Sequence, residues 1–244
     1  SPTTSLRPCP IPERIPSNNA HKACGLDPQA LLEVCMENRR SNYDITRDRV
    51  EGEFPRCDQA AVIEKFHLAH DGDYIYLRFI ALDYRISRKT GRVERLPEAV
   101  HAGFNEVMTI YDVLCGSKPG AQLSGEFVRV NDLDGVTKTA YLGGNLFDGS
   151  AKAFTHRTRA LCAACERLGG TPGMVGDVSY TIPLFDFFPV TLQFWDGDEE
   201  FDPVLKLMWD RRTLDFMRYE TTWYAAGHLL ERLQELMAHV EHSL

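Results

Sequence analysis

The stretch YIYLRFIALDYRIS, residues 74–87, decides the fold of this chain. Apolar and polar side chains alternate along its first half, which places Ile75, Leu77 and Phe79 on one face of a strand. The turn sequence HDGD precedes it at 70–73, and KTGR follows it at 89–92. Gly-containing turns between alternating segments are typical of hairpins. We therefore expect an antiparallel meander from about residue 62 to 95.

Outside the meander, the periodicity indicates several helices. Apolar residues recur at helical spacing from Val100 to Cys115, between Pro97 at the start and Gly116 at the end. By the same reasoning, further helices are expected at 28–42, 150–168 and 221–240, a helix or irregular turn at 204–217, and strands at 126–130, 178–185 and 190–195. Strands and helices do not alternate strictly. The fold class expected is α+β, with an antiparallel sheet (the meander plus a C-terminal hairpin) packed against several helices around a single core.

The chain contains no repeat, low-complexity block or long flexible linker that would divide it. Residues 1–26 are rich in Pro, Ser and Asn, and we interpret them as an N-terminal arm. Asp27 and Pro28 are typical of the start of a helix. We therefore expect one domain over residues 27–244.

Charge and composition restrict the classes of partner. The formal net charge is -8, which opposes binding to a polyanion, so no nucleic acid is expected. No apolar run reaches the roughly 20 residues that a membrane helix needs, and the first residues do not resemble a signal peptide. The seven cysteines are odd in number and widely spaced, which favours reduced thiols and a cytoplasmic location.

The segment FWDGDEEFDP, residues 194–203, places five carboxylates close together after an apolar stretch. Crowded carboxylates repel one another unless a cation or hydrogen-bond donors offset the repulsion. Oxygen ligands suit a divalent metal ion, and paired acids can perform general acid–base chemistry. Asp196, Asp198 and Glu199 are therefore candidate metal ligands, and the alternative is a solvated acidic turn.

Aromatic residues are concentrated between positions 180 and 224. Such rings usually fill a core, but they can also wall a pocket for a flat ligand. The candidate cofactor-binding residues are Phe187, Phe194, Trp195, Trp209 and Trp223.

Two further patterns carry weaker signals. Cys162 and Cys165 have C-x-x-C spacing within an expected helix, where packing is favoured over redox or metal chemistry unless Cys9, Cys24, Cys35 or Cys57 lies nearby. The histidines are expected to be scattered, with His101 on the helix that begins at Pro97 and His228 at a surface or edge. The nucleotide-binding, zincin and α/β-hydrolase motifs are absent from the sequence.

The segment from Met108 to Leu233 resembles an uncharacterised domain family, a domain of unknown function found mainly in anaerobic bacteria and archaea. The resemblance is carried by LSGEF at 123–127, LGG at 168–170, GD at 176–177, the strand at 189–195, DEEF at 198–201 and LMWD at 207–210. Some members of that family are fused to iron–sulfur cluster domains of a type seen in corrinoid-linked proteins. The resemblance implies no established activity.

Three functions follow as alternatives. The first is a cofactor- or small-ligand-binding protein of anaerobic metabolism, with a corrinoid or haem as candidate cofactor. The second is a metal-dependent enzyme that uses the acidic cluster at 196–202 with a divalent metal. The third is a non-catalytic scaffold that binds a protein partner. The sequence leaves open whether the protein is an enzyme.

Overall fold

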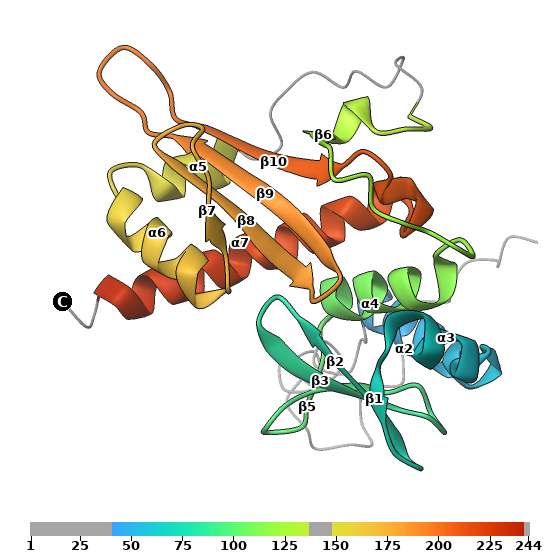
Figure 1. Cartoon of the computed structure of the whole chain (residues 1–244). Coiled ribbons are helices and arrows are strands. Elements are labelled where there is room, and N and C mark those ends of the chain that lie inside the picture. The colour runs from blue at the N-terminus through green and yellow to red at the C-terminus, as the bar shows by residue number, and fades with distance from the viewer. Residues whose placement is uncertain (1–40, 137–147, 242–244) are drawn as a thin grey trace, which may run out of the picture. The chain divides into compact units, whose positions relative to one another are not determined.

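The computed structural model describes residues 41–136 and 148–241, and Figure 1 shows how their helices and strands are arranged. The described residues from 42 onward belong to one compact unit. The expected arm at 1–26 and residues 28–40 of the first expected helix lie outside the described residues.

The meander forms as the alternating pattern predicts. It comprises β1 (Ala69–His70), β2 (Tyr74–Phe79), β3 (Leu82–Ser87), β4 (Val93–Arg95) and β5 (Val100–His101). All neighbouring pairs are antiparallel. Ile75, Leu77 and Phe79 are buried, which confirms that they share the core face of β2.

The second half of the chain extends the same sheet. Its strands are β6 (Phe127–Arg129), β7 (Thr171–Pro172), β8 (Val178–Phe185), β9 (Phe188–Trp195) and β10 (Val204–Asp210). The sheet order is β5-β4-β3-β2-β8-β9-β10-β6, with β1 beside β2 and β7 beside β8. The two halves join where Phe79 pairs with Phe185 and the Ile80 N–H donates to the Leu184 carbonyl at 2.7 Å.

The α-helices of the described residues are α2 (Asn42–Glu53), α3 (Gln59–Phe66), α4 (Phe104–Gly116), α5 (Asp148–Phe154), α6 (Thr158–Arg167) and α7 (Tyr219–Glu241). Short 3-10 helices lie at η1 (Phe54–Arg56), η2 (Val130–Asp132) and η3 (Thr213–Asp215). The long α7 packs against both α4 and α6 and crosses behind β8 and β9 (Figure 1). This arrangement confirms the α+β class with one core. None of the helices in the described ranges has the length and apolar composition needed to span a bilayer.

Two element boundaries differ from the expectation. The helix expected from Pro97 begins at Phe104, because the Glu106 side chain accepts a hydrogen bond from the Gly103 N–H and fixes the first turn there. His101 therefore lies in strand β5 and not on a helix. Residues 59–66 form α3 and not the first strand of the meander, since Asp58 caps this helix by accepting from the Ala61 N–H at 3.1 Å.

Two further elements were assigned wrongly from the sequence. Residues 204–210 form strand β10 between β9 and β6, and they bury alternate side chains as a strand does. The helix expected at 150–168 is two helices, α5 and α6, interrupted at His156 with its φ of 59°. The closing helix is confirmed as α7.

Candidate functional site

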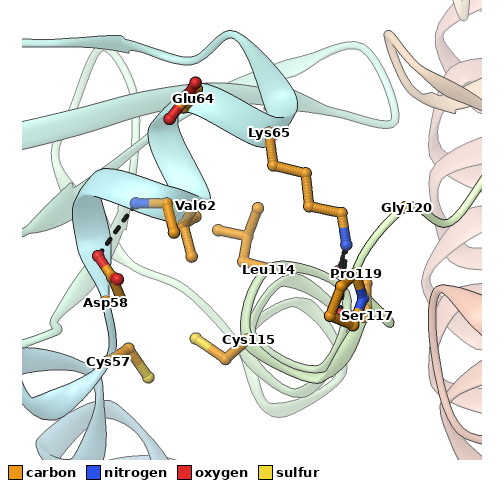
Figure 2. Close-up of a pocket in the computed structure, with 11 residues that line it drawn as sticks. Cys57, Asp58, Val62, Glu64, Lys65, Leu114, Cys115, Ser117, Pro119 and Gly120 are labelled. Carbon is orange, nitrogen blue, oxygen red and sulfur yellow. Dashed lines mark hydrogen bonds between the residues drawn. The ribbon is translucent and has the colours of Figure 1, made fainter.

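A pocket of about 590 Å³ lies between α3 and the C-terminal end of α4 (Figure 2). Small-molecule sites in proteins have volumes of about 300–1,000 Å³, so this pocket is large enough for one. We name it the thiol pocket; it is lined by Cys57, Asp58, Ala61, Val62, Glu64, Lys65, Leu114, Cys115, Ser117, Pro119 and Gly120.

Two cysteine thiols lie next to each other in this pocket. Cys57 follows η1, and Cys115 lies in the last turn of α4. Both are free thiols, and Figure 2 shows their side chains beside each other at the pocket wall. Desolvation of the thiol, reinforced by the neighbouring Cys57, raises the pKa of Cys115 above its usual value. Cys115 is therefore a neutral thiol at physiological pH, and it would become a thiolate only on binding an electrophile or a metal ion.

Lys65 closes one side of the pocket. Its Nζ donates to the Ser117 carbonyl at 3.2 Å, the Ser117 hydroxyl at 2.6 Å and the Lys118 carbonyl at 2.7 Å, and Figure 2 shows it reaching across to this segment. Partial burial lowers the pKa of this ammonium group. Because an ammonium has three N–H donors, these contacts use all of them. Lys65 thus holds the chain after α4 in place and has no donor left for an anionic ligand.

The same two thiols also line a second pocket, of about 340 Å³. Its other walls include the charged side chains of Arg49, Glu53 and Arg218. Cys57 and Cys115 can therefore be approached from a largely apolar pocket and from a polar one. This shared position makes the thiol pair the chemically most distinctive feature of the described residues.

A third pocket, of about 440 Å³, lies between the meander and the β8–β9 turn. Phe187, one of the predicted cofactor-binding residues, lines it and stacks on Phe66 with ring centroids 4.4 Å apart. Arg78 and Asp83 add charge to its wall. In this pocket, residues of the aromatic-rich segment 180–224 and residues of the meander line the same cavity.

The other predicted aromatic residues are spread over the structure. Phe194 and Trp209 are buried in the core, on β9 and β10. Trp195 is partly exposed and lies beneath the Lys206 ammonium, 4.6 Å from its ring centroid. Trp223 lies on α7 and packs edge-to-face on Tyr219. None of these four is among the lining residues of the three pockets described above, and their role in ligand binding stays a prediction.

The acidic segment forms a turn between β9 and β10. Asp196 accepts hydrogen bonds from the His156 N–H at 2.9 and 3.1 Å, and Asp198 accepts from the N–H groups of Glu200 and Phe201 at 2.8 Å. These backbone donors lower the pKa of Asp198. Glu199 is exposed. Asp196, Asp198 and Glu199 do not form a group of converging ligand atoms in the part of the chain that the structure describes.

The structure contains a buried polar network around Glu106 that the sequence did not predict. The Glu106 carboxylate accepts from the Tyr84 hydroxyl and from Arg95 Nη2 at 2.8 Å, and His228 Nε2 lies 3.7 Å away. His228 is 4% exposed, so its assignment to a surface or edge was wrong. The signal was present: His228 lies three residues after Ala225 and seven after Thr221, on the buried side of α7.

The two C-x-x-C cysteines, Cys162 and Cys165, lie within a helix, as expected. Both are on α6, and Cys165 is fully buried, which raises the pKa of its thiol. Four other cysteines were considered as additional ligands, and of these the structure describes Cys57. It lies beside Cys115.

Residues 58–232 match the family model described as Domain of unknown function (DUF3786), which covers more than half of the chain. The chain belongs to the DUF3786 family. The DUF3786 match begins at Asp58, so it includes Lys65 and Cys115 and leaves Cys57 just outside. No curated protein and no solved structure matches the chain.

Proposed function

We propose that this DUF3786 protein binds a small, largely apolar ligand or cofactor in the thiol pocket. The observation that carries the proposal is the meeting of two free thiols, from two separate elements, in a pocket of about 590 Å³. Reduced thiols of this kind are stable in the cytoplasm, where we expect the protein to act. The proposal involves a small molecule and needs neither nucleic acid nor a membrane.

The charge of the pocket restricts the class of ligand. Val62, Leu114 and Pro119 supply apolar wall, and Lys65 has its three donors engaged. The remaining charged groups, Asp58 and Glu64, are acidic. The part of the ligand inside the pocket is therefore expected to be neutral or cationic, with any acidic substituents, such as the propionates of a haem, outside it.

The chemistry of the thiols further restricts the class of ligand. Sulfur is a soft ligand, and a cysteine thiolate is an axial ligand of iron in some haem proteins. A tetrapyrrole or corrinoid with a metal at its centre could use Cys115 or Cys57 in this way. The resemblance to a family of anaerobes, some of whose members are fused to iron–sulfur domains of corrinoid-linked type, supports testing this class first.

Coordination would have to remove a proton from the thiol. Because the pKa of Cys115 is raised, that proton is released only at a cost that falls as the pH rises. Binding through Cys115 should therefore strengthen between pH 6.5 and 8.5, whereas purely apolar binding should not.

The test is a titration of the reduced full chain with haemin and, separately, with aquacobalamin, followed by visible absorbance. We expect a saturable 1:1 spectral change that strengthens with pH and weakens at least tenfold in Cys115→Ser or Cys57→Ser. Cys162→Ser on α6 is the matched control and should bind as the wild type does. The proposal fails if neither probe changes its spectrum, or if both thiol-pocket variants bind as tightly as the control.

A further inference from the structure

A histidine and two carboxylates converge beside the C-terminal half of α2. His101 Nε2 lies 3.0 Å from both carboxylate oxygens of Glu51. Asp48 precedes Glu51 by three residues on α2, so both side chains lie on one face of that helix. One ligand atom from each of the three residues lies within 4.8 Å of the other two.

These separations suit a single metal ion. Zinc bonds of about 2.0–2.2 Å place two ligand atoms of one tetrahedron about 3.4 Å apart. The His101 and Glu51 ligand atoms, 3.0 Å apart, are slightly closer than this tetrahedral distance. The Asp48 ligand atom lies within 4.8 Å of both, a bound that is longer than the tetrahedral distance. Small side-chain rotations would therefore bring the three atoms to one ion without moving the backbone.

The surroundings hold the central ligand rigidly. Glu51 is 5% exposed, and its Oε1 accepts a 2.9 Å hydrogen bond from the Val93 N–H. Hydrogen bonds of this kind orient a metal ligand and tune its basicity. The side chains of His101 and Asp48 are 20% and 35% exposed, so an ion can enter from solvent.

The charge of the group also favours a cation. The two carboxylates together carry two negative charges, and an imidazole binds a metal in its neutral form. Arg47 offsets this charge in part, with its Nε 3.2 Å from Asp48 Oδ1, but its Nη1 lies 3.3 Å from Asp44 on the same helix. A divalent ion would neutralise both carboxylates, including the buried one of Glu51.

We propose that Asp48, Glu51 and His101 bind a divalent transition-metal ion, with water in its remaining coordination positions. The imidazole favours a metal of the zinc, cobalt or iron class over Mg²⁺ or Ca²⁺, which prefer all-oxygen sites. Three protein ligands with an open position are typical of zinc sites that act on a bound water or substrate. The site is separate from the thiol pocket and does not depend on its proposed function.

The test uses Co²⁺ as a spectroscopic probe on the full chain after treatment with a chelator. Cobalt bound by nitrogen and oxygen lacks the strong near-ultraviolet charge-transfer bands of cobalt thiolates, so this site is distinguished from any binding at the cysteines. The titration is repeated in Cys57→Ser/Cys115→Ser, where we expect 1:1 binding by calorimetry to remain. Metal should also raise the melting temperature, because it binds the folded state.

The decisive variants are Asp48→Asn and His101→Gln. Each should weaken Co²⁺ binding at least tenfold, whereas Asp44→Asn, one turn earlier on α2, should leave it unchanged. Asp48 is partly exposed, so its variant is expected to fold, and circular dichroism checks this. The proposal is overturned if the wild type binds no Co²⁺ with nitrogen and oxygen ligands, or if Asp48→Asn and His101→Gln bind as Asp44→Asn does.

Discussion

The buried carboxylate of Asp210 accepts a 2.8 Å hydrogen bond from the backbone N–H of Gly125, 85 residues earlier in the chain. The same carboxylate accepts from the N–H groups of Ser124 at 3.0 Å and Arg212 at 2.9 Å. Asp210 ends the LMWD segment, and Gly125 lies within LSGEF, so two of the segments that carry the family resemblance meet here. These hydrogen bonds connect the end of β10 to the loop before β6, and we call them the Asp210 joint.

Replacing Asp210 by Asn should destabilise the protein by about 2–4 kcal/mol, because an amide NH₂ would face a buried N–H donor in place of an acceptor. The measurement is the free energy of unfolding in urea. Asp215→Asn is the control: its partner Lys118 is largely exposed, and we expect a loss below about 1 kcal/mol. Equal losses in the two variants would show that the Asp210 joint contributes no more than a surface pair.

The pH dependence of stability should depend on His228. Burial lowers its pKa to about 4, although the nearby Glu106 opposes this shift. As the pH falls below about 6.5, the unfolded chain takes up a proton that the folded state does not, so stability falls. Burial would raise the pKa of Glu106, but the nearby His228 and the hydrogen bond from Tyr84 outweigh this cost, so the pKa is also lowered from its usual value.

We therefore expect this histidine to contribute a loss of about 1.5 kcal/mol between pH 6.5 and 5, because the slope approaches 1.36 kcal/mol for each pH unit only well below pH 6.5. His228→Gln should remove that part of the slope, whatever its effect on the stability at pH 7. His70→Gln, at an exposed residue of β1, should keep the wild-type slope. Parallel slopes in the wild type and His228→Gln would contradict the assignment of a neutral, buried imidazole.

Gly91 should tolerate no side chain. It has a φ of 75°, and a Cβ added there would lie 1.9 Å from the carbonyl oxygen of Glu51. Gly91→Ala should cost about 3 kcal/mol or more, since either the turn or α2 must move. Gly72 has open space around it, so Gly72→Ala should change the unfolding free energy by less than about 1 kcal/mol. A Gly91→Ala protein as stable as the Gly72 variant would show that the turn and α2 do not pack this closely.

The parts of the fold that the sequence predicted correctly have local causes. The period of two in 74–87 and the turns on either side follow from neighbouring residues alone, and so does the stripe of α7. By contrast, α2 is polar and buries only Glu51 among its side chains, so it lacks the apolar stripe that would have indicated a helix. Strand β10 was taken for a helix or irregular turn because the three consecutive apolar residues at 207–209 obscure the alternation typical of a strand. Of its two partners, β9 directly precedes it and β6 comes from a distant part of the chain.

The candidate sites depend on tertiary structure more strongly still. Cys57 and Cys115 lie on separate elements, and no sequence spacing indicates that their thiols meet. His101 was placed on a helix because Pro97 resembles a helix start, and that error separated it from Glu51. Among the predicted cofactor residues, Phe187 lines a described pocket because it lies in the turn where the two halves of the sheet meet.

Lys65 should control the shape of the thiol pocket more than the stability of the fold. Lys65→Met keeps most of the side-chain stem but removes the three donors to Ser117 and Lys118. We expect a loss of about 1 kcal/mol, because these hydrogen bonds are only partly shielded from water. Hydrogen exchange should become faster in residues 117–121 and stay unchanged in the meander. Lys89→Met, which removes an exposed pair with Asp73, is the control and should alter neither quantity measurably. If exchange at 117–121 is the same in both variants, the segment after α4 is held by its other contacts, and Lys65 does not close the pocket.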